Sequence, residues 1–118
     1  MSKHEAFLEK LRHSNEVTIT VKRRTSGKDF SAPVWFNVEG QKVVLVPMKG
    51  SKSGWFKDLQ REPQITLSVG GDRVSAGARP TRGSKEVERI LAGFRSKYES
   101  VWSDSYYTNR DVFVEIPL

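Results

Sequence analysis

Short runs of alternating apolar and polar residues fill most of this chain, and each run ends at a turn. In Val17–Lys22, β-branched apolar residues alternate with polar ones, which is typical of a half-buried β-strand. Further strands are expected at Pro33–Val38, Lys42–Val46, Gln64–Val69, Asp72–Arg79 and Val112–Ile116. Hairpin turns at Glu39-Gly40-Gln41 and Gly70-Gly71 favour antiparallel pairing, so the six strands predict a small barrel.

Three helices are expected around these strands. The first covers His4–Arg12, and the second covers Trp55–Arg61 with Ser53 as its N-cap. The third begins at Ser84, which we expect to be its N-cap. It has one apolar face made of Val87, Ile90, Leu91, Phe94, Tyr98 and Val101. The predicted class is therefore α+β, mainly β.

The length and composition predict one globular domain over residues 1–118. Hydrophobic residues make up 36% of the chain and charged residues 29%, an ordinary globular balance. There is no cysteine, which excludes disulfides and thiolate chemistry. No apolar run is long enough for a signal peptide or a bilayer span, so a cytoplasmic location is expected.

The charge of the chain predicts an anionic partner. The formal net charge is +6 and the isoelectric point is about 9.8. Nucleic acid, an acidic membrane surface and a phosphorylated small molecule all match that sign. Hydrolase and metal chemistry are disfavoured, because no Gly-x-Ser-x-Gly motif is present and the two histidines, His4 and His13, lack metal-ligand spacing.

Two basic turns are candidate anion sites. Gly50-Ser51-Lys52-Ser53-Gly54 lies between a strand and a helix, where small residues and free backbone N–H groups favour an anion. The second turn contains Lys22-Arg23-Arg24 and Lys28. In a barrel with this strand order the two turns converge at one end, and either could otherwise be a solvated loop.

Aromatic residues flank both turns. Phe36 and Phe56 are expected in the core, whereas Trp35 and Trp55 could form a wall for a flat ring. Tyr98, Tyr106 and Tyr107 occur late in the chain; they either pack in the core or a dimer interface, or place a phenol in a cleft.

Together these segments resemble the flavin-binding split-barrel superfamily that includes pyridoxamine phosphate oxidase, and especially its deazaflavin-dependent nitroreductase branch. The resemblance runs from about Val17 to the last strand. It is carried by Arg24-Thr25-Ser26-Gly27-Lys28, Ala32-Pro33-Val34-Trp35-Phe36, Gly50-Ser51-Lys52-Ser53-Gly54-Trp55, Asp58-Leu59 and Glu62-Pro63. Relatives often carry Gly-Arg-Lys where this chain has Arg23-Arg24-Thr25. Its loop before Trp55 is also one residue shorter than the common Lys-His-Pro-Ala-Trp version.

The resemblance implies a dimeric six-stranded antiparallel split β-barrel with flanking helices and with the coenzyme at the subunit boundary. By the same resemblance, the phosphate side of the coenzyme is served by Arg24, Ser26, Lys28, Gly50, Ser51 and Lys52. The ring is lined by Val34, Trp35 and Trp55. Tyr106 and Tyr107 are candidates to face the substrate, and Tyr107 to assist proton transfer.

The function implied is hydride transfer from reduced coenzyme F420, a deazaflavin, to a small organic electron acceptor, with the coenzyme carrying the redox chemistry. Three alternatives remain open. They are an FMN-binding oxidoreductase of the same fold, a coenzyme carrier without turnover, and a basic barrel that binds nucleic acid.

Overall fold

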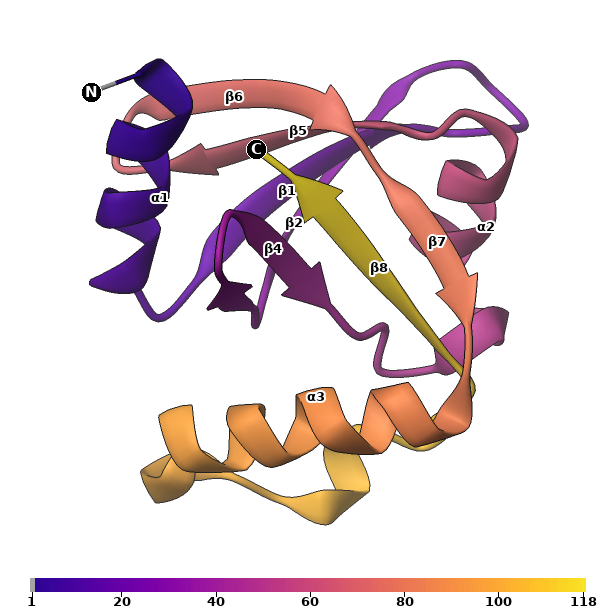
Figure 1. Ribbon diagram of the computed structural model, residues 1–118. Coiled ribbons are helices and arrows are strands. Elements are labelled where there is room, and N and C mark those ends of the chain that lie inside the picture. Colours follow the sequence, from indigo (N-terminus) through magenta and orange to yellow (C-terminus); the bar gives the residue numbers. More distant parts are fainter. Residues whose placement is uncertain (1) are drawn as a thin grey trace.

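The computed structural model describes residues 2–118 and contains eight strands in two four-stranded antiparallel sheets. The first sheet has the order β2-β1-β5-β6, formed by β1 (Val17–Lys22), β2 (Asp29–Val34), β5 (Gln64–Val69) and β6 (Asp72–Gly77). The second has the order β3-β4-β8-β7, formed by β3 (Asn37–Glu39), β4 (Lys42–Leu45), β7 (Arg79–Arg82) and β8 (Val112–Pro117). Figure 1 shows the two sheets facing each other.

The predicted α+β class and antiparallel pairing are confirmed, but the count of six strands is wrong. The expected strand Pro33–Val38 is broken at Trp35 and Phe36, which separate β2 from β3. The expected strand Asp72–Arg79 is broken at Ala78, which separates β6 from β7. At each break the chain passes from one sheet to the other. The alternation of apolar and polar residues continues through this corner, so it predicted one strand where the structure has two.

The side chains of β4 explain why that strand is apolar on both faces. Val43 and Leu45 point into the core between the sheets, whereas Val44 and Val46 belong to a second apolar cluster on the outside. The pairing of β4 with β3 and β8 confirms that it is a central strand. Pro33, which has no N–H to donate, lies in β2 at the edge of the first sheet, where a strand tolerates proline.

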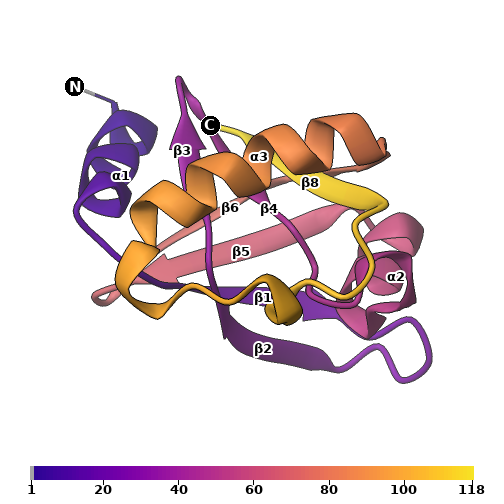
Figure 2. The ribbon, with the colours of Figure 1, turned by 90° about the horizontal axis from the view of Figure 1, so that it is seen from below.

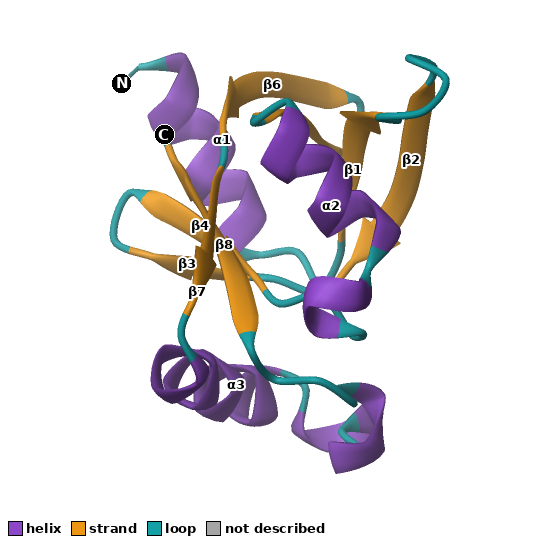
Figure 3. Ribbon diagram, turned by 90° about the vertical axis from the view of Figure 1, so that its right-hand side faces the viewer, coloured by secondary structure: helices purple, strands orange, loops and turns teal. Residues whose placement is uncertain are grey.

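Three helices cover the barrel. Helix α1 (Lys3–Arg12) and α2 (Gly54–Arg61) lie at opposite ends of it and contribute to the inner core (Figures 1 and 3). Helix α3 (Ser84–Lys97) contacts β3 and β8, and it crosses the second sheet in the view from below (Figure 2). None of the helices in residues 2–118 has the length and apolarity that crossing a bilayer requires.

The third helix differs from its prediction at both ends. Its N-cap is Gly83, and Ser84 is its first helical residue. The helix ends at Lys97, and the chain continues as the short 3₁₀ turns η2 (Glu99–Val101) and η3 (Asp104–Tyr106). Val101, expected on the apolar face, is 54% exposed, because it lies beyond the last turn that packs on the sheet.

Candidate functional site

A cleft of about 320 Å³ opens where the chain leaves the first sheet for the second. One part of its lining is apolar and comes from β2, the corner after it, the end of β4 and the loop after α3. The other part is polar and comes from the two basic turns. The lining residues are Arg23, Phe30, Ala32, Pro33, Val34, Trp35, Val46, Met48, Lys49, Ser53, Gly54, Trp55 and Tyr107.

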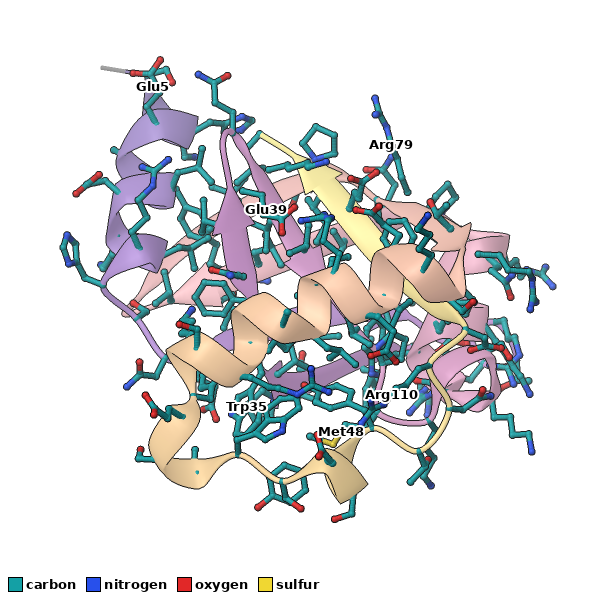
Figure 4. All side chains as sticks on the ribbon, turned by 60° about the horizontal axis from the view of Figure 1, so that its bottom comes forward. Glu5, Trp35, Glu39, Met48, Arg79 and Arg110 are labelled. Atoms are coloured by element: carbon teal, nitrogen blue, oxygen red, sulfur yellow. The ribbon has the colours of Figure 1, made fainter. Side chains whose placement is uncertain are left out.

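Trp35 is the centre of an aromatic cluster beside this cleft. Its indole stacks on the Tyr98 ring, with 4.3 Å between the centroids and 6° between the planes. Trp102 lies 6.3 Å away and Tyr106 meets Trp35 edge-on at 5.6 Å. Figure 4 shows Trp35 and Met48 close together beneath α3. The cleft therefore has a rigid aromatic wall at one side.

Backbone hydrogen bonds fix the position of this wall. The Tyr98 hydroxyl accepts a bond from the Phe36 N–H at 3.1 Å and lies within hydrogen-bond distance of the Asn15 and Phe36 carbonyls. Tyr98 is 5% exposed. Its role is thus to tie α3 to the corner after β2, rather than to reach the cleft.

Tyr107 places a phenol in the cleft. Its ring is 3% exposed, stacks on Trp102 at 5.6 Å and packs edge-on against Phe94. Burial raises the pKa of the Tyr107 hydroxyl well above the ordinary tyrosine value. The hydroxyl therefore keeps its proton at neutral pH and is available as a hydrogen-bond donor.

The two basic turns meet at the start of α2, where Arg24 Nη1 lies 3.2 Å from the Gly54 carbonyl. Asp58 on α2 has no side-chain exposure and accepts hydrogen bonds from both arginines of the first turn. Arg23 Nη1 lies 3.0 Å from one carboxylate oxygen, and Arg24 Nη1 lies 2.7 Å from the other. Burial alone would raise the pKa of Asp58, but the hydrogen bonds from Arg24 and the charges of both arginines lower it below the usual range.

Asp111 fixes the loop before α2 by accepting two hydrogen bonds from Ser51. The Ser51 N–H donates to Asp111 Oδ1 at 3.0 Å, and the Ser51 hydroxyl donates to Oδ2. Gly50 has a φ of +57°, and a Cβ on it would come within 2.3 Å of the Asn109 carbonyl and of Asp111. Only glycine fits this position, and Gly50 and Ser51 face the protein rather than the cleft.

The structure therefore separates the predicted site residues into two groups. Val34, Trp35, Trp55 and Tyr107 line the cleft. The remaining six do not line it. They are Arg24, Ser26, Lys28 and Lys52, which are exposed, Ser51, which bonds to Asp111 in the loop before β8, and Gly50, which packs closely against that loop.

Several residues that build the site have no role predicted from the sequence. Met48 and Lys49 line the cleft together with Arg23. Asp58 bonds to the first basic turn, and Asp111 bonds to Ser51 in the second. Of these residues, only Asp58 offered a signal in the sequence. It is an acidic residue next to Leu59 in a short helix that must bury one face. Within residues 2–118, no group of three or more histidine or acidic side chains is placed to bind a metal ion.

Comparisons with known proteins give a family and a fold. A family described as "Uncharacterized protein conserved in bacteria (DUF2255)" matches residues 7–111. No curated protein matches the sequence. Each of the solved structures below covers most of this chain.

A candidate pyridoxamine 5′-phosphate oxidase from Listeria innocua superposes with a TM-score of 0.71 at 13% identity, over 98% of this chain and 92% of that one. An F420-H2 dependent reductase gives a TM-score of 0.64 at 19% identity, over 86% and 93%. A protein described as a domain-swapped dimer gives 0.65 at 17% identity, over 95% and 94%. These similarities confirm the predicted split-barrel fold.

Proposed function

The chain belongs to the DUF2255 family of bacterial proteins, and from the geometry of its cleft we propose that it is an oxidoreductase that uses coenzyme F420. The reaction proposed is hydride transfer from the reduced deazaflavin to a small organic acceptor. One observation carries the proposal: a single cleft joins a cationic end to an aromatic wall.

The residues present fit a coenzyme of this kind. Arg23, Lys49 and Ser53 line the polar part of the cleft, and Trp35 and Trp55 belong to its apolar part. A ligand that satisfies both parts has an anionic group and a flat apolar ring. F420 has both features, and when bound it supplies hydride chemistry. The similarity to an F420-H2 dependent reductase supports the choice of this coenzyme.

The predicted site residues take two roles in this proposal. Val34, Trp35 and Trp55 would line the ring. The exposed Ser26, Lys28 and Lys52 would serve the phosphate and the tail carboxylates, where charge-assisted hydrogen bonds are strongest. Arg24 would hold the turn that carries Ser26 and Lys28, and Gly50 and Ser51 would hold the loop that carries Lys52.

Tyr107 is the proposed proton donor. Its hydroxyl stays protonated at neutral pH because burial raises its pKa, and the residue lines the cleft. A phenol so placed can hydrogen-bond to an acceptor and give it a proton after hydride arrives.

We also propose that the protein is a homodimer. Two apolar side chains near the cleft are unusually exposed, Met48 at 47% and Tyr106 at 43%. A similar structure is described as a domain-swapped dimer. A second copy placed over these side chains would cover the open side of the cleft. Light scattering on a gel-filtration column is expected to give twice the mass of 13.4 kDa, and a monomer at all concentrations would disprove the dimer.

The coenzyme is tested by titrating the protein with F420 and FMN side by side. Micromolar binding of F420, with oxidation of its reduced form by a quinone, is the expected result. Binding of FMN alone would favour the FMN alternative, which the similarity to a candidate pyridoxamine 5′-phosphate oxidase supports. Binding of F420 without turnover would identify a carrier, and binding of neither would refute the proposal.

A matched pair of variants locates the coenzyme. Lys49 lines the cleft, whereas Lys57 is exposed on α2 and does not line it. Lys49→Ala should weaken F420 binding by about tenfold, the loss expected for one charge-assisted contact. Lys57→Ala should leave it nearly unchanged, and equal effects would place the coenzyme outside the cleft.

A further inference from the structure

The start of α2 presents unused hydrogen-bond donors to the cleft. Ser53 occupies the N-cap position but makes no capping bond with its side chain, and it lines the cleft while being only 7% exposed. The first helical bond is donated by the Lys57 N–H to the Ser53 carbonyl at 3.1 Å. The N–H groups of Gly54, Trp55 and Phe56 therefore have no partner within the helix, and they carry the positive end of its dipole.

Arg23 lies directly beside these donors. Its guanidinium carbon is 3.8 Å from the centre of the Phe30 ring, and its Nη1 donates to Asp58 at 3.0 Å. A Cβ added to Gly54 would lie only 2.9 Å from Nη1. Phe30 below and Asp58 at one edge fix the plane of the group, and a guanidinium has five N–H donors. Donors that Asp58 does not occupy remain for a ligand in the cleft.

The charges at this point do not cancel. Asp58 carries one negative charge and is shared by Arg23 and Arg24, which leaves the group of three with a net charge of about +1. Lys49 adds a further positive charge to the lining. An anion in this part of the cleft is attracted without displacing an internal ion pair.

Arg24 has a different environment. Its N–H and its Nη1 both donate to Asp58, at 3.1 and 2.7 Å, and Nη1 also reaches the Gly54 carbonyl at 3.2 Å. It does not line the cleft. These bonds join the turn after β1 to α2, so Arg24 fastens the turn that carries Arg23.

We propose that Arg23, the Ser53 hydroxyl and the free N–H groups at the start of α2 form a phosphate-binding site, with Arg24 fastening the turn rather than contacting the ligand. The inference deepens the proposed function, on which it rests for the identity of the phosphate carrier. It moves the principal cationic contact from Arg24 to Arg23.

Inorganic phosphate is the probe that tests the site without any coenzyme. In ¹H–¹⁵N spectra of the full chain, phosphate should shift the amide signals of Gly54 and Trp55. Arg23→Gln should weaken phosphate binding by about 10- to 100-fold, because a charge-assisted pair is lost. Lys57→Gln removes the same charge from an exposed position on α2 that does not line the cleft and should change the affinity less than about threefold.

Two further variants separate contact from scaffolding. Gly54→Ala keeps every charge and improves helix propensity, but its methyl group displaces the Arg23 guanidinium; it should weaken phosphate binding several-fold with an unchanged or higher melting temperature. Arg24→Gln should lower the melting temperature and cost less affinity than Arg23→Gln. A larger loss of affinity with Arg24→Gln, or wild-type affinity in both Arg23→Gln and Gly54→Ala, would overturn the proposal.

The outcomes for site and function are distinguishable. Phosphate binding that depends on Arg23, with no binding of F420 or FMN, would refute the proposed function and support this site. Tight coenzyme binding that Arg23→Gln leaves unchanged would refute this site and leave the function standing.

Discussion

Replacing Tyr98 by phenylalanine should destabilise the protein while leaving its cleft intact. The hydroxyl accepts the buried Phe36 N–H at 3.1 Å and can donate its one proton to the Asn15 or the Phe36 carbonyl. Without the hydroxyl, the Phe36 carbonyl still accepts from Lys97 Nζ at 3.0 Å. The Phe36 N–H has no such substitute and becomes a buried unpaired donor.

The magnitude follows from that single donor. Leaving one buried N–H unpaired costs about 1–3 kcal/mol, and a value near the middle corresponds to a fall of about 6–10 °C in melting temperature for a domain of this size. The aromatic ring remains in the variant, so its stacking on Trp35 at 4.3 Å is kept. Phosphate or coenzyme affinity, measured well below the transition, should therefore change less than about twofold.

Calorimetry on the wild type, Tyr98→Phe and Tyr106→Phe tests the argument. Tyr106 also contacts Trp35 but is 43% exposed, so loss of its hydroxyl should shift the melting temperature by no more than about 2 °C. Equal shifts in the two variants would show that the Tyr98 hydrogen bonds contribute nothing net. A tenfold loss of ligand affinity in Tyr98→Phe would show that the hydroxyl, not the ring, positions Trp35.

Three further predictions concern single ionisable groups. Burial lowers the pKa of Lys97 to about 8. Between pH 8 and the ordinary lysine pKa near 10.5, the amine is protonated in the unfolded chain but not in the folded one, so this group makes the free energy of unfolding rise with pH. Lys97→Met should thus gain stability against the wild type at pH 7 and lose that advantage by pH 10 in urea titrations; an equal difference at both pH values would contradict the assignment. The pKa of Asp58 is lowered in the fold, so its contribution is present above the ordinary value of about 3.9 and is lost as the pH falls through the folded pKa. The melting temperature of Asp58→Asn should lie furthest below that of the wild type at neutral pH and converge with it in acid, and a constant gap would be the contrary result. Tyr107→Phe should keep F420 affinity within about twofold and slow oxidation of the reduced coenzyme at least tenfold, in stopped-flow traces; an unchanged rate would remove Tyr107 from proton transfer.

Local patterns in the sequence were sufficient for most elements of the fold. Alternation predicted β1, β4, β5 and β8 close to their observed bounds, because burial of one strand face imposes a period of two whatever the partner. Positive φ angles at Gly40 and Gly70 confirm the two hairpin turns, since glycine adopts them without strain. The loop between β4 and α2 was also placed correctly as a turn of small residues.

The corners between the sheets could not be predicted in the same way. Trp35-Phe36 and Ala78 interrupt no hydrophobic pattern, yet the chain changes sheets at both. The position of a corner depends on how the two sheets pack, and that packing joins residues far apart in the chain.

The sequence by itself therefore determined most of the strands and helices, and which turns are basic. Only the tertiary structure decided that both arginines of the turn bond to Asp58 and that Arg23 lines the cleft while its neighbour Arg24 does not. The deciding group, Asp58, lies 34 residues beyond Arg24. A buried carboxylate needs cationic partners. Which side chains supply them depends on which ones lie within reach of Asp58 once α2 has packed against β1.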